Sequence, residues 1–138
     1  MGLFRRTGNM PDNISVKAGE ISLNGFRMNS QPTVEVAGCV TVNSSPHLRS
    51  VLLRLLHAGS GSVMTIDLSK VSYIDISGIA TLMEALRIAR ECEAKLRLTG
   101  MSGQVRMLAE VTELDRIYKA AGSEVVLWRF SGPKNSVR

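Results

Sequence analysis

"SVMTIDLSKVSYIDISGIATLMEALRIAR", residues Ser62–Arg90, is the stretch that decides the fold. Its first part, Ser62–Ser69, is a short and nearly continuous apolar run of β-forming residues, which is typical of a strand buried on both faces of a sheet. Its second part has the apolar spacing of an amphipathic helix, on a face made of Ile79, Leu82, Met83, Leu86 and Ala89. The stretch therefore predicts a buried strand that passes through a short polar step, "DISG", into a helix.

The rest of the chain alternates strand and helix patterns in the same way. Further strands are predicted at Thr33–Val42, Lys95–Gly100 and Glu124–Phe130, with a weaker one at Ile21–Met28 in which Asn24-Gly25 indicates a turn. Further helices are predicted from a cap at Ser44 or Ser45, around Val105–Ala109, and as a turn or short helix at Leu114–Ala120. This order predicts one α/β domain, with a mixed central sheet of four to five strands packed by about four helices. We expect the domain to span residues 20–130, with a mobile leader at 1–19 and a loose tail at 131–138.

Composition suits an ordinary globular core, since 44% of the 138 residues are hydrophobic. No stretch approaches the roughly 18 uninterrupted apolar residues of a spanning helix, and the first ten residues lack the apolar segment of a signal peptide. Cys39 and Cys92 lie far apart, with no CxxC or Cys/His cluster beside them, which predicts buried thiols rather than a metal or redox site. We therefore expect a cytoplasmic protein with no cofactor, no metal and no membrane insertion.

The net charge of +5 does not by itself indicate a nucleic-acid partner. A nucleic-acid interface gathers basic residues on one face and adds aromatic side chains that stack on bases. Here the basic residues alternate with acids, as in "EALRIARECEAKLR" at residues 84–97, which is typical of solvated helix faces. We expect no nucleic-acid partner.

Asp75 to Gly78, the "DISG" step, does not match a catalytic motif. An aspartic-protease site needs two such carboxylates, a nucleophile elbow needs Gly two residues before its serine, and no phosphate-binding glycine loop is present. A helix cap at Asp75 or Ser77, worth about 1 kcal/mol, is the structural interpretation. Because glycine inside a helix costs about 1 kcal/mol relative to alanine, Gly78 needs a further reason. Close approach of a partner, or of an enzyme acting on Ser77, is one candidate.

Read without gaps, the chain resembles a STAS domain, the domain of bacterial anti-sigma factor antagonists. The matching motifs are a strand ending in Asp67-Leu68-Ser69 and, at a helix start, Asp75-Ile76-Ser77-Gly78. An amphipathic helix, a Leu-x-Leu strand and a Val-Arg-x-x-Leu helix ending near Leu-Asp follow in the same order. The resemblance covers roughly Thr33–Tyr118.

The resemblance implies a phosphorylation switch. In these antagonists the serine directly before the glycine is phosphorylated by a kinase that is itself the anti-sigma factor, and Ser77 holds that position. The implied partners are that serine kinase and a serine phosphatase acting on phospho-Ser77. We expect a monomer or weak dimer with no enzymatic activity of its own. The implied partner-binding residues are Asp75, Ile76, Gly78, Thr41, Asn43 and Ser44.

Two departures and one alternative accompany the resemblance. Ile76 replaces a small hydroxyl residue, and Thr41 stands where many antagonists carry an acidic residue beside the docking surface. The alternative is a small STAS subunit of a lipid-trafficking ABC transporter, which contacts its ATPase through the same helix start without phosphorylation. Ser77 favours the sigma-regulator interpretation.

Overall fold

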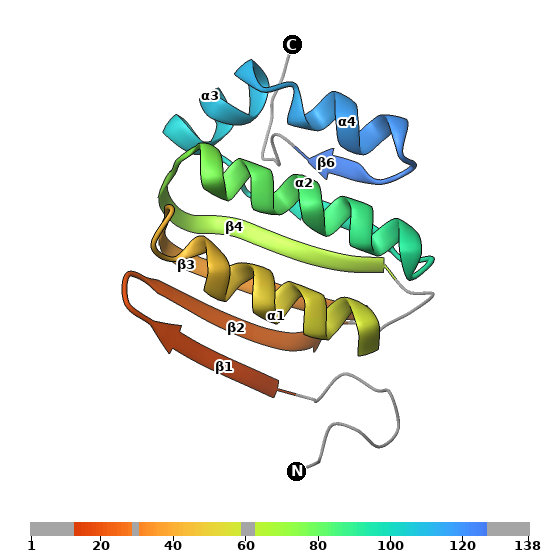
Figure 1. Cartoon of the computed structure of the whole chain (residues 1–138), viewed down its shortest axis with the longest axis horizontal. Helices are drawn as coiled ribbons and strands as arrows, with labels where there is room; N and C mark the ends of the chain where they lie inside the picture. The colour runs from red at the N-terminus through yellow and green to blue at the C-terminus, as the bar shows by residue number, and fades with distance from the viewer. Residues whose placement is uncertain (1–12, 29–30, 59–62, 127–138) are drawn as a thin grey trace.

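The computed structural model of the chain describes residues 13–28, 31–58 and 63–126 (Figure 1). The strands are β1 (Asn13–Ala18), β2 (Ile21–Met28), β3 (Gln31–Val40), β4 (Val63–Ile74), β5 (Lys95–Thr99) and β6 (Glu124–Val126), and the helices are α1 (Ser45–Ala58), α2 (Ile76–Glu91), α3 (Gly103–Val111) and α4 (Leu114–Ala120). The predicted α/β domain with a mixed sheet is confirmed.

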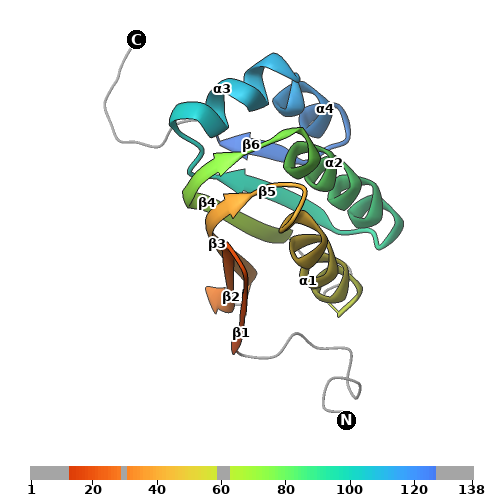
Figure 2. The same ribbon diagram turned by 60° about the vertical axis from the view of Figure 1, so that its left-hand side comes forward.

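The sheet has the strand order β1-β2-β3-β4-β5-β6. β1, β2 and β3 pair antiparallel, whereas β3, β4, β5 and β6 pair parallel. The parallel connections are made by helices, as parallel strands require. In Figures 1 and 2, α1 and α2 lie side by side over one face of the sheet, and α3 and α4 lie beyond β5 and β6.

Only one face of the sheet is covered by α1 and α2, so the prediction that the strand at 62–69 is buried on both faces is wrong. Along β4, Met64, Ile66 and Leu68 are buried, while the alternate residues Thr65 and Asp67 are half-buried. The apolar run conceals this period of two, which is typical of a sheet with one face towards the core and one towards solvent.

The N-terminal hairpin corrects two further predictions. Residues 13–18, placed in a mobile leader, form β1 and pair with β2, so the sheet has one strand more than the upper expectation of five. The chain turns at Gly19, where φ is +60°, and β2 runs unbroken through Asn24-Gly25 because β3 pairs with it along its whole length. The rest of the expected leader (1–12), the end of the last predicted strand (127–130) and the tail (131–138) lie outside the described residues.

The core is apolar, with Tyr118 as its largest fully buried side chain. The Tyr118 hydroxyl donates to the carbonyl oxygen of Leu82 at 2.5 Å, which ties α4 to α2. Burial raises the pKa of this phenol far above its ordinary value. Cys39 and Cys92 are half-buried rather than buried and form no disulfide. No helix within the described ranges is long and apolar enough to cross a membrane.

Replacing Tyr118 with phenylalanine should lower the free energy of unfolding by about 1 kcal/mol, because a buried hydrogen bond is lost while the ring remains. Urea denaturation measures the change. Tyr73→Phe is the matched control, because Tyr73 is 46% exposed and its substitution should change stability by less than about 0.5 kcal/mol. Equal losses in both variants would contradict this account of the Tyr118 contact.

Candidate functional site

The candidate site lies where β3 and β4 end. The two strands are parallel neighbours, and their last residues, Val40 and Ile74, are register partners. The amide of Asp75 donates to the carbonyl oxygen of Val40 at 3.0 Å, which continues the pairing by one residue. The loop at 41–44 and the first turn of α2 are therefore side by side, at the end where α1 and α2 both begin (Figure 1).

Asp75 is the centre of this site. It is the N-cap of α2, and its Oδ1 accepts hydrogen bonds from the Gly78 amide at 3.1 Å and from the Ser77 hydroxyl at 2.5 Å. Its Oδ2 accepts from the Val42 amide, also at 3.1 Å, so one carboxylate joins the two loops. Partial burial opposes ionisation, but the hydrogen bonds from Ser77, Gly78 and Val42 together lower the pKa of Asp75 below its ordinary value. The predicted cap at Asp75 is confirmed.

Ser77 is half-buried in the first turn of α2. Its hydroxyl is the donor to Asp75, and its carbonyl oxygen accepts from the Thr81 hydroxyl at 3.0 Å. The Ser77 oxygen therefore sits at the positive end of a helix of 16 residues, beside a carboxylate.

Gly78 is buried, and the interior of the protein explains why it is glycine. A Cβ atom added there would lie 2.5 Å from Cγ1 of Ile74 and 2.8 Å from Cγ1 of Val40, which is too close for real atoms. The close approach is therefore that of the ends of β3 and β4, and not that of a partner's backbone. Gly78, predicted as a partner-binding residue, thus has a role within the chain, where it lets α2 pack onto the strand ends.

Ser44, predicted as a partner-binding residue, is likewise buried, at 1% exposure in the isolated chain. Its hydroxyl accepts from the Thr41 amide at 2.9 Å and donates to the carbonyl oxygen of Cys39 at 2.6 Å. The side chain thus turns back towards the end of β3 and holds the loop, instead of capping α1.

The outward-facing residues of the site are mostly uncharged. Ile76 is 61% exposed and Val42 is 66% exposed, Asn43 is exposed, and Thr41 is half-buried. Val42 and Tyr73 were not predicted as site residues. Val42 follows β3 by two residues, and Tyr73 is the last residue but one of β4, a strand whose alternate residues face inward. Large apolar side chains exposed together at one edge are typical of a surface that contacts another protein.

Gln104 is a supporting residue that sequence reasoning missed. β4 extends beyond β5, and the Gln104 side chain takes the place of a neighbouring strand at Ile74. Its Oε1 accepts from the Ile74 amide at 3.0 Å, and its Nε2 donates to the Ile74 carbonyl oxygen at 2.7 Å. No local sequence pattern marks this contact, because it joins residues 30 positions apart.

The site offers hydrogen-bonding groups but no metal ligand set. Among residues 13–28, 31–58 and 63–126, no group of three or more His, Cys, Asp or Glu side chains is placed to hold a metal ion. What the arrangement presents is the Ser77 hydroxyl, held by Asp75 at a helix start whose first residue, Ile76, is exposed.

Known proteins match the chain across this site. The family described as "Mlab, STAS domain" matches residues 25–126. The anti-sigma-B factor antagonist of Listeria monocytogenes is 30% identical over 89 residues, which are 64% of this chain and 77% of that protein. An anti-sigma factor antagonist structure from Mycobacterium paratuberculosis aligns with a TM-score of 0.64 at 20% identity, over 73% of this chain and 86% of that one. The structure of the anti-sigma factor antagonist SpoIIAA in its unphosphorylated form aligns with a TM-score of 0.56 at 11% identity, over 75% of this chain and 86% of that one.

Replacing Asp75 with alanine should lower the free energy of unfolding by about 1 kcal/mol at pH 7, because the cap of α2 is lost. The pKa of Asp75 is lower in the folded protein than its ordinary value of about 3.9. Its ionised form therefore stabilises the fold above that value, and the contribution is lost as the pH falls through the lowered pKa. Urea denaturation at pH 7 and pH 3 should show the difference between the two proteins shrinking in acid. A constant difference would contradict the role assigned to the charge.

Proposed function

The chain belongs to the STAS domain family, and we propose that it is an anti-sigma factor antagonist that works in the cytoplasm. In its unphosphorylated form it binds a serine kinase that is an anti-sigma factor, which then releases its sigma factor. The observation that carries the proposal is the placement of Ser77 at the start of α2, next to the exposed Ile76 and hydrogen-bonded to Asp75, which also accepts the amide of the exposed Val42. Relatives named as antagonists of anti-sigma-B factor support it.

Unmodified, the site suits a protein contact. When a partner binds, the exposed apolar side chains of Val42 and Ile76 are removed from water, which is favourable. Ser77 adds no charge, and its hydroxyl already has a partner in Asp75. A kinase bound at this surface has the Ser77 oxygen, the atom that it phosphorylates, inside the interface.

Phosphorylation reverses these conditions. The Ser77 oxygen attacks the γ-phosphorus of ATP bound by the kinase, a new O–P bond forms, the bond to ADP breaks, and the hydroxyl proton passes to a base of the kinase. The product carries about −1.5 to −2 charges. Phospho-Ser77 no longer donates to Asp75, and the two anions compete for the amides at the start of α2. The helix dipole stabilises the phosphate within the chain, but burying it between Val42 and Ile76 has a large desolvation cost.

A serine phosphatase restores the first state. Water replaces the Ser77 oxygen on phosphorus, inorganic phosphate leaves, and the hydroxyl returns to Asp75. In this cycle the antagonist supplies the acceptor oxygen and the surface, whereas the kinase and the phosphatase supply the catalytic groups.

Ser77→Ala should bind the kinase in the presence of ATP without losing affinity over time, whereas Ser77→Asp should bind at least about tenfold more weakly than wild type, because a carboxylate at this place must be desolvated. Isothermal titration of each variant with the purified serine kinase measures both affinities. Intact mass after incubation with kinase and ATP should show one phosphate on wild type and none on Ser77→Ala.

Ser72→Ala is the control for the mass measurement, because Ser72 is an exposed hydroxyl close by on β4 and its loss should leave one phosphate. A phosphate that persists in Ser77→Ala would move the modification elsewhere. Equal affinities of Ser77→Ala and Ser77→Asp would reject the switch.

A second candidate is a small subunit of a lipid-trafficking ABC transporter that binds the ATPase through the same edge. One feature favours it: the Ser77 hydroxyl is satisfied inside the chain by Asp75, so the surface formed by Val42 and Ile76 is complete without modification. Under this function the protein binds a transporter ATPase and gains no phosphate. Co-purification with permease and ATPase components, together with an unchanged mass, would favour it over the sigma-regulator function.

A further inference from the structure

Glu20 lies beside the candidate site although it is distant from it in sequence. It follows Gly19 in the turn between β1 and β2, and its carbonyl oxygen accepts from the amide of Cys39 at 3.1 Å. Gly38 makes this approach possible, because φ there is +104° and an added Cβ atom would collide with the Glu20 carbonyl oxygen. The turn is therefore held against the end of β3.

The carboxylate of Glu20 is held as well as its backbone. The Thr41 hydroxyl donates to Oε2 of Glu20, and Oγ1 of Thr41 in turn accepts from the Asn43 amide at 3.2 Å. Val42, the residue between them, donates its amide to Asp75. The loop at 41–43 is thus hydrogen-bonded to the Glu20 carboxylate through Thr41 and, separately, to the carboxylate that holds Ser77 through the Val42 amide.

Glu20 also differs from most exposed glutamates in its charge environment. Five glutamates form ion pairs, namely Glu35 with Lys70, Glu84 with Arg49 and Arg87, Glu91 with Arg87, Glu110 with Arg106, and Glu113 with Arg116. Glu20 is exposed and forms no ion pair within the described part of the chain. Residues 41–46 and 71–86 contain no Lys or Arg, and the nearest basic residue along the chain is the exposed Lys17, three residues before Glu20 on β1.

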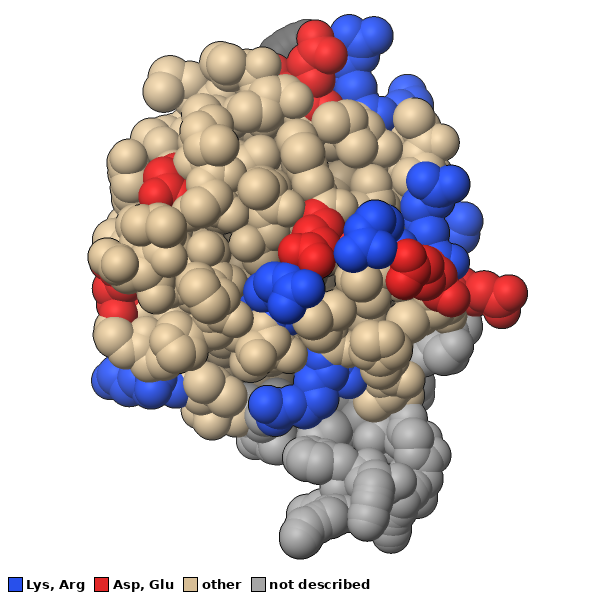
Figure 3. All heavy atoms as spheres, in the orientation of Figure 1, with Lys and Arg blue, Asp and Glu red and all other residues tan. Residues whose placement is uncertain are grey.

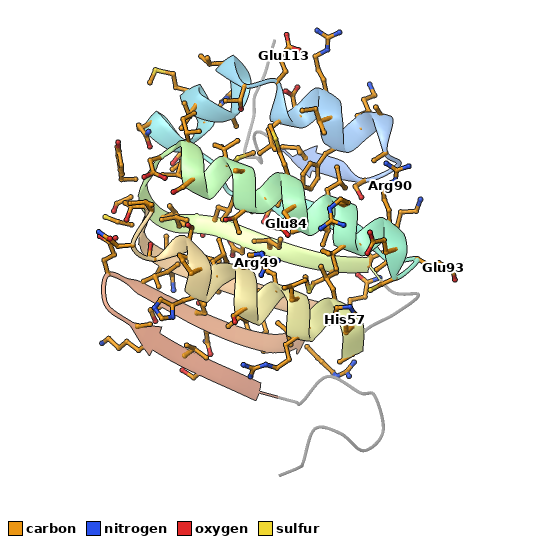
Figure 4. The ribbon with its side chains drawn as sticks, in the orientation of Figure 1. Arg49, His57, Glu84, Arg90, Glu93 and Glu113 are labelled. Atoms are coloured by element: carbon orange, nitrogen blue, oxygen red, sulfur yellow. The ribbon has the colours of Figure 1, made fainter. Side chains whose placement is uncertain are left out.

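The basic residues gather elsewhere. In Figure 3 the Lys and Arg side chains on the visible face lie over the middle and right of the molecule, along its lower side and at its lower left, whereas the surface over the starts of α1 and α2 is mostly uncharged. Charges of opposite sign are paired between and along α1 and α2: Arg49 faces Glu84 across the two helices (Figure 4), and Arg87 pairs with Glu84 and Glu91 on α2. The site therefore combines the exposed apolar side chains of Val42 and Ile76 with the carboxylate of Glu20, and the base nearest to Glu20 along the chain, Lys17, forms no ion pair with it among the described residues.

From this arrangement we infer that Glu20 is part of the docking surface for the proposed kinase, and that the kinase places a basic side chain against it. The inference rests on the proposed function and adds a residue that determines specificity. The surface then extends from Ile76 through Val42 to the turn between β1 and β2, and Thr41 positions its acidic end. Charge complementarity at an interface rim steers association and fixes orientation, so a basic contact here directs the partner to the edge that holds Ser77.

The test compares Glu20→Lys and Glu20→Gln with Glu93→Lys. Glu93 is the matched control, because it is exposed, forms no ion pair within the ranges described, and lies at the opposite end of α2 (Figure 4). The probe is the purified anti-sigma serine kinase of the source organism, with affinity measured at low and high salt and Ser77 phosphorylation followed in the same samples. Thermal unfolding of each variant checks that folding is intact.

Glu20→Lys should weaken binding at least about tenfold at low salt, since a repulsive charge meets the partner's basic group. Glu20→Gln should weaken it less, and the loss should shrink at high salt as charges are screened. Glu93→Lys should stay within about twofold of wild type. Thr41→Val should give a smaller loss that disappears in the Glu20→Gln background, because its hydroxyl acts through Glu20.

Equal effects of Glu20→Lys and Glu93→Lys would overturn the assignment of Glu20, while phosphorylation of Ser77 in those samples would leave the proposed function standing. If the wild-type protein is neither bound nor phosphorylated by the kinase, the proposed function fails and this inference fails with it.

Discussion

β3 and β4 are hydrogen-bonded parallel neighbours, so their C-terminal ends lie side by side, with Val40 opposite Ile74. Each strand then passes into a helix, so the loop at 41–44 and the first turn of α2 have to share that edge. The Asp75 carboxylate joins them, because it caps α2 through Gly78 and accepts the amide of Val42. The pairing of the strand ends and the Asp75 carboxylate together hold the two loops side by side.

The structural cap and the proposed phosphorylation site share one carboxylate. The Ser77 hydroxyl is a donor to Asp75 in the unmodified chain. A helix start favours anions, but its few amides cannot satisfy a carboxylate and a phosphate equally well. The proposed switch therefore needs no second folded state: it changes the charge at a place where the surrounding side chains are apolar and exposed.

Prediction succeeded where the interaction is local and failed where it is not. The cap at Asp75 and the apolar face of α2 involve residues within one or two turns, so their spacing in the chain reveals them. The strand β1 escaped prediction because its stability comes from pairing with β2. Gly78 and Ser44 were assigned to the surface, yet both are buried, because the strand ends that cover them are brought in by the sheet.

The sequence alone determined the order of strands and helices from β2 onward and the position of Ser77 at the start of α2, because periodicity and capping are properties of neighbouring residues. The tertiary structure decided which side chains face outward at that edge, so that Ile76 and Val42 form one exposed surface. It also placed the Glu20 carboxylate on Thr41, 21 positions away along the chain. Contacts between distant segments follow from strand pairing and close packing, and neither leaves a pattern within any single stretch of sequence.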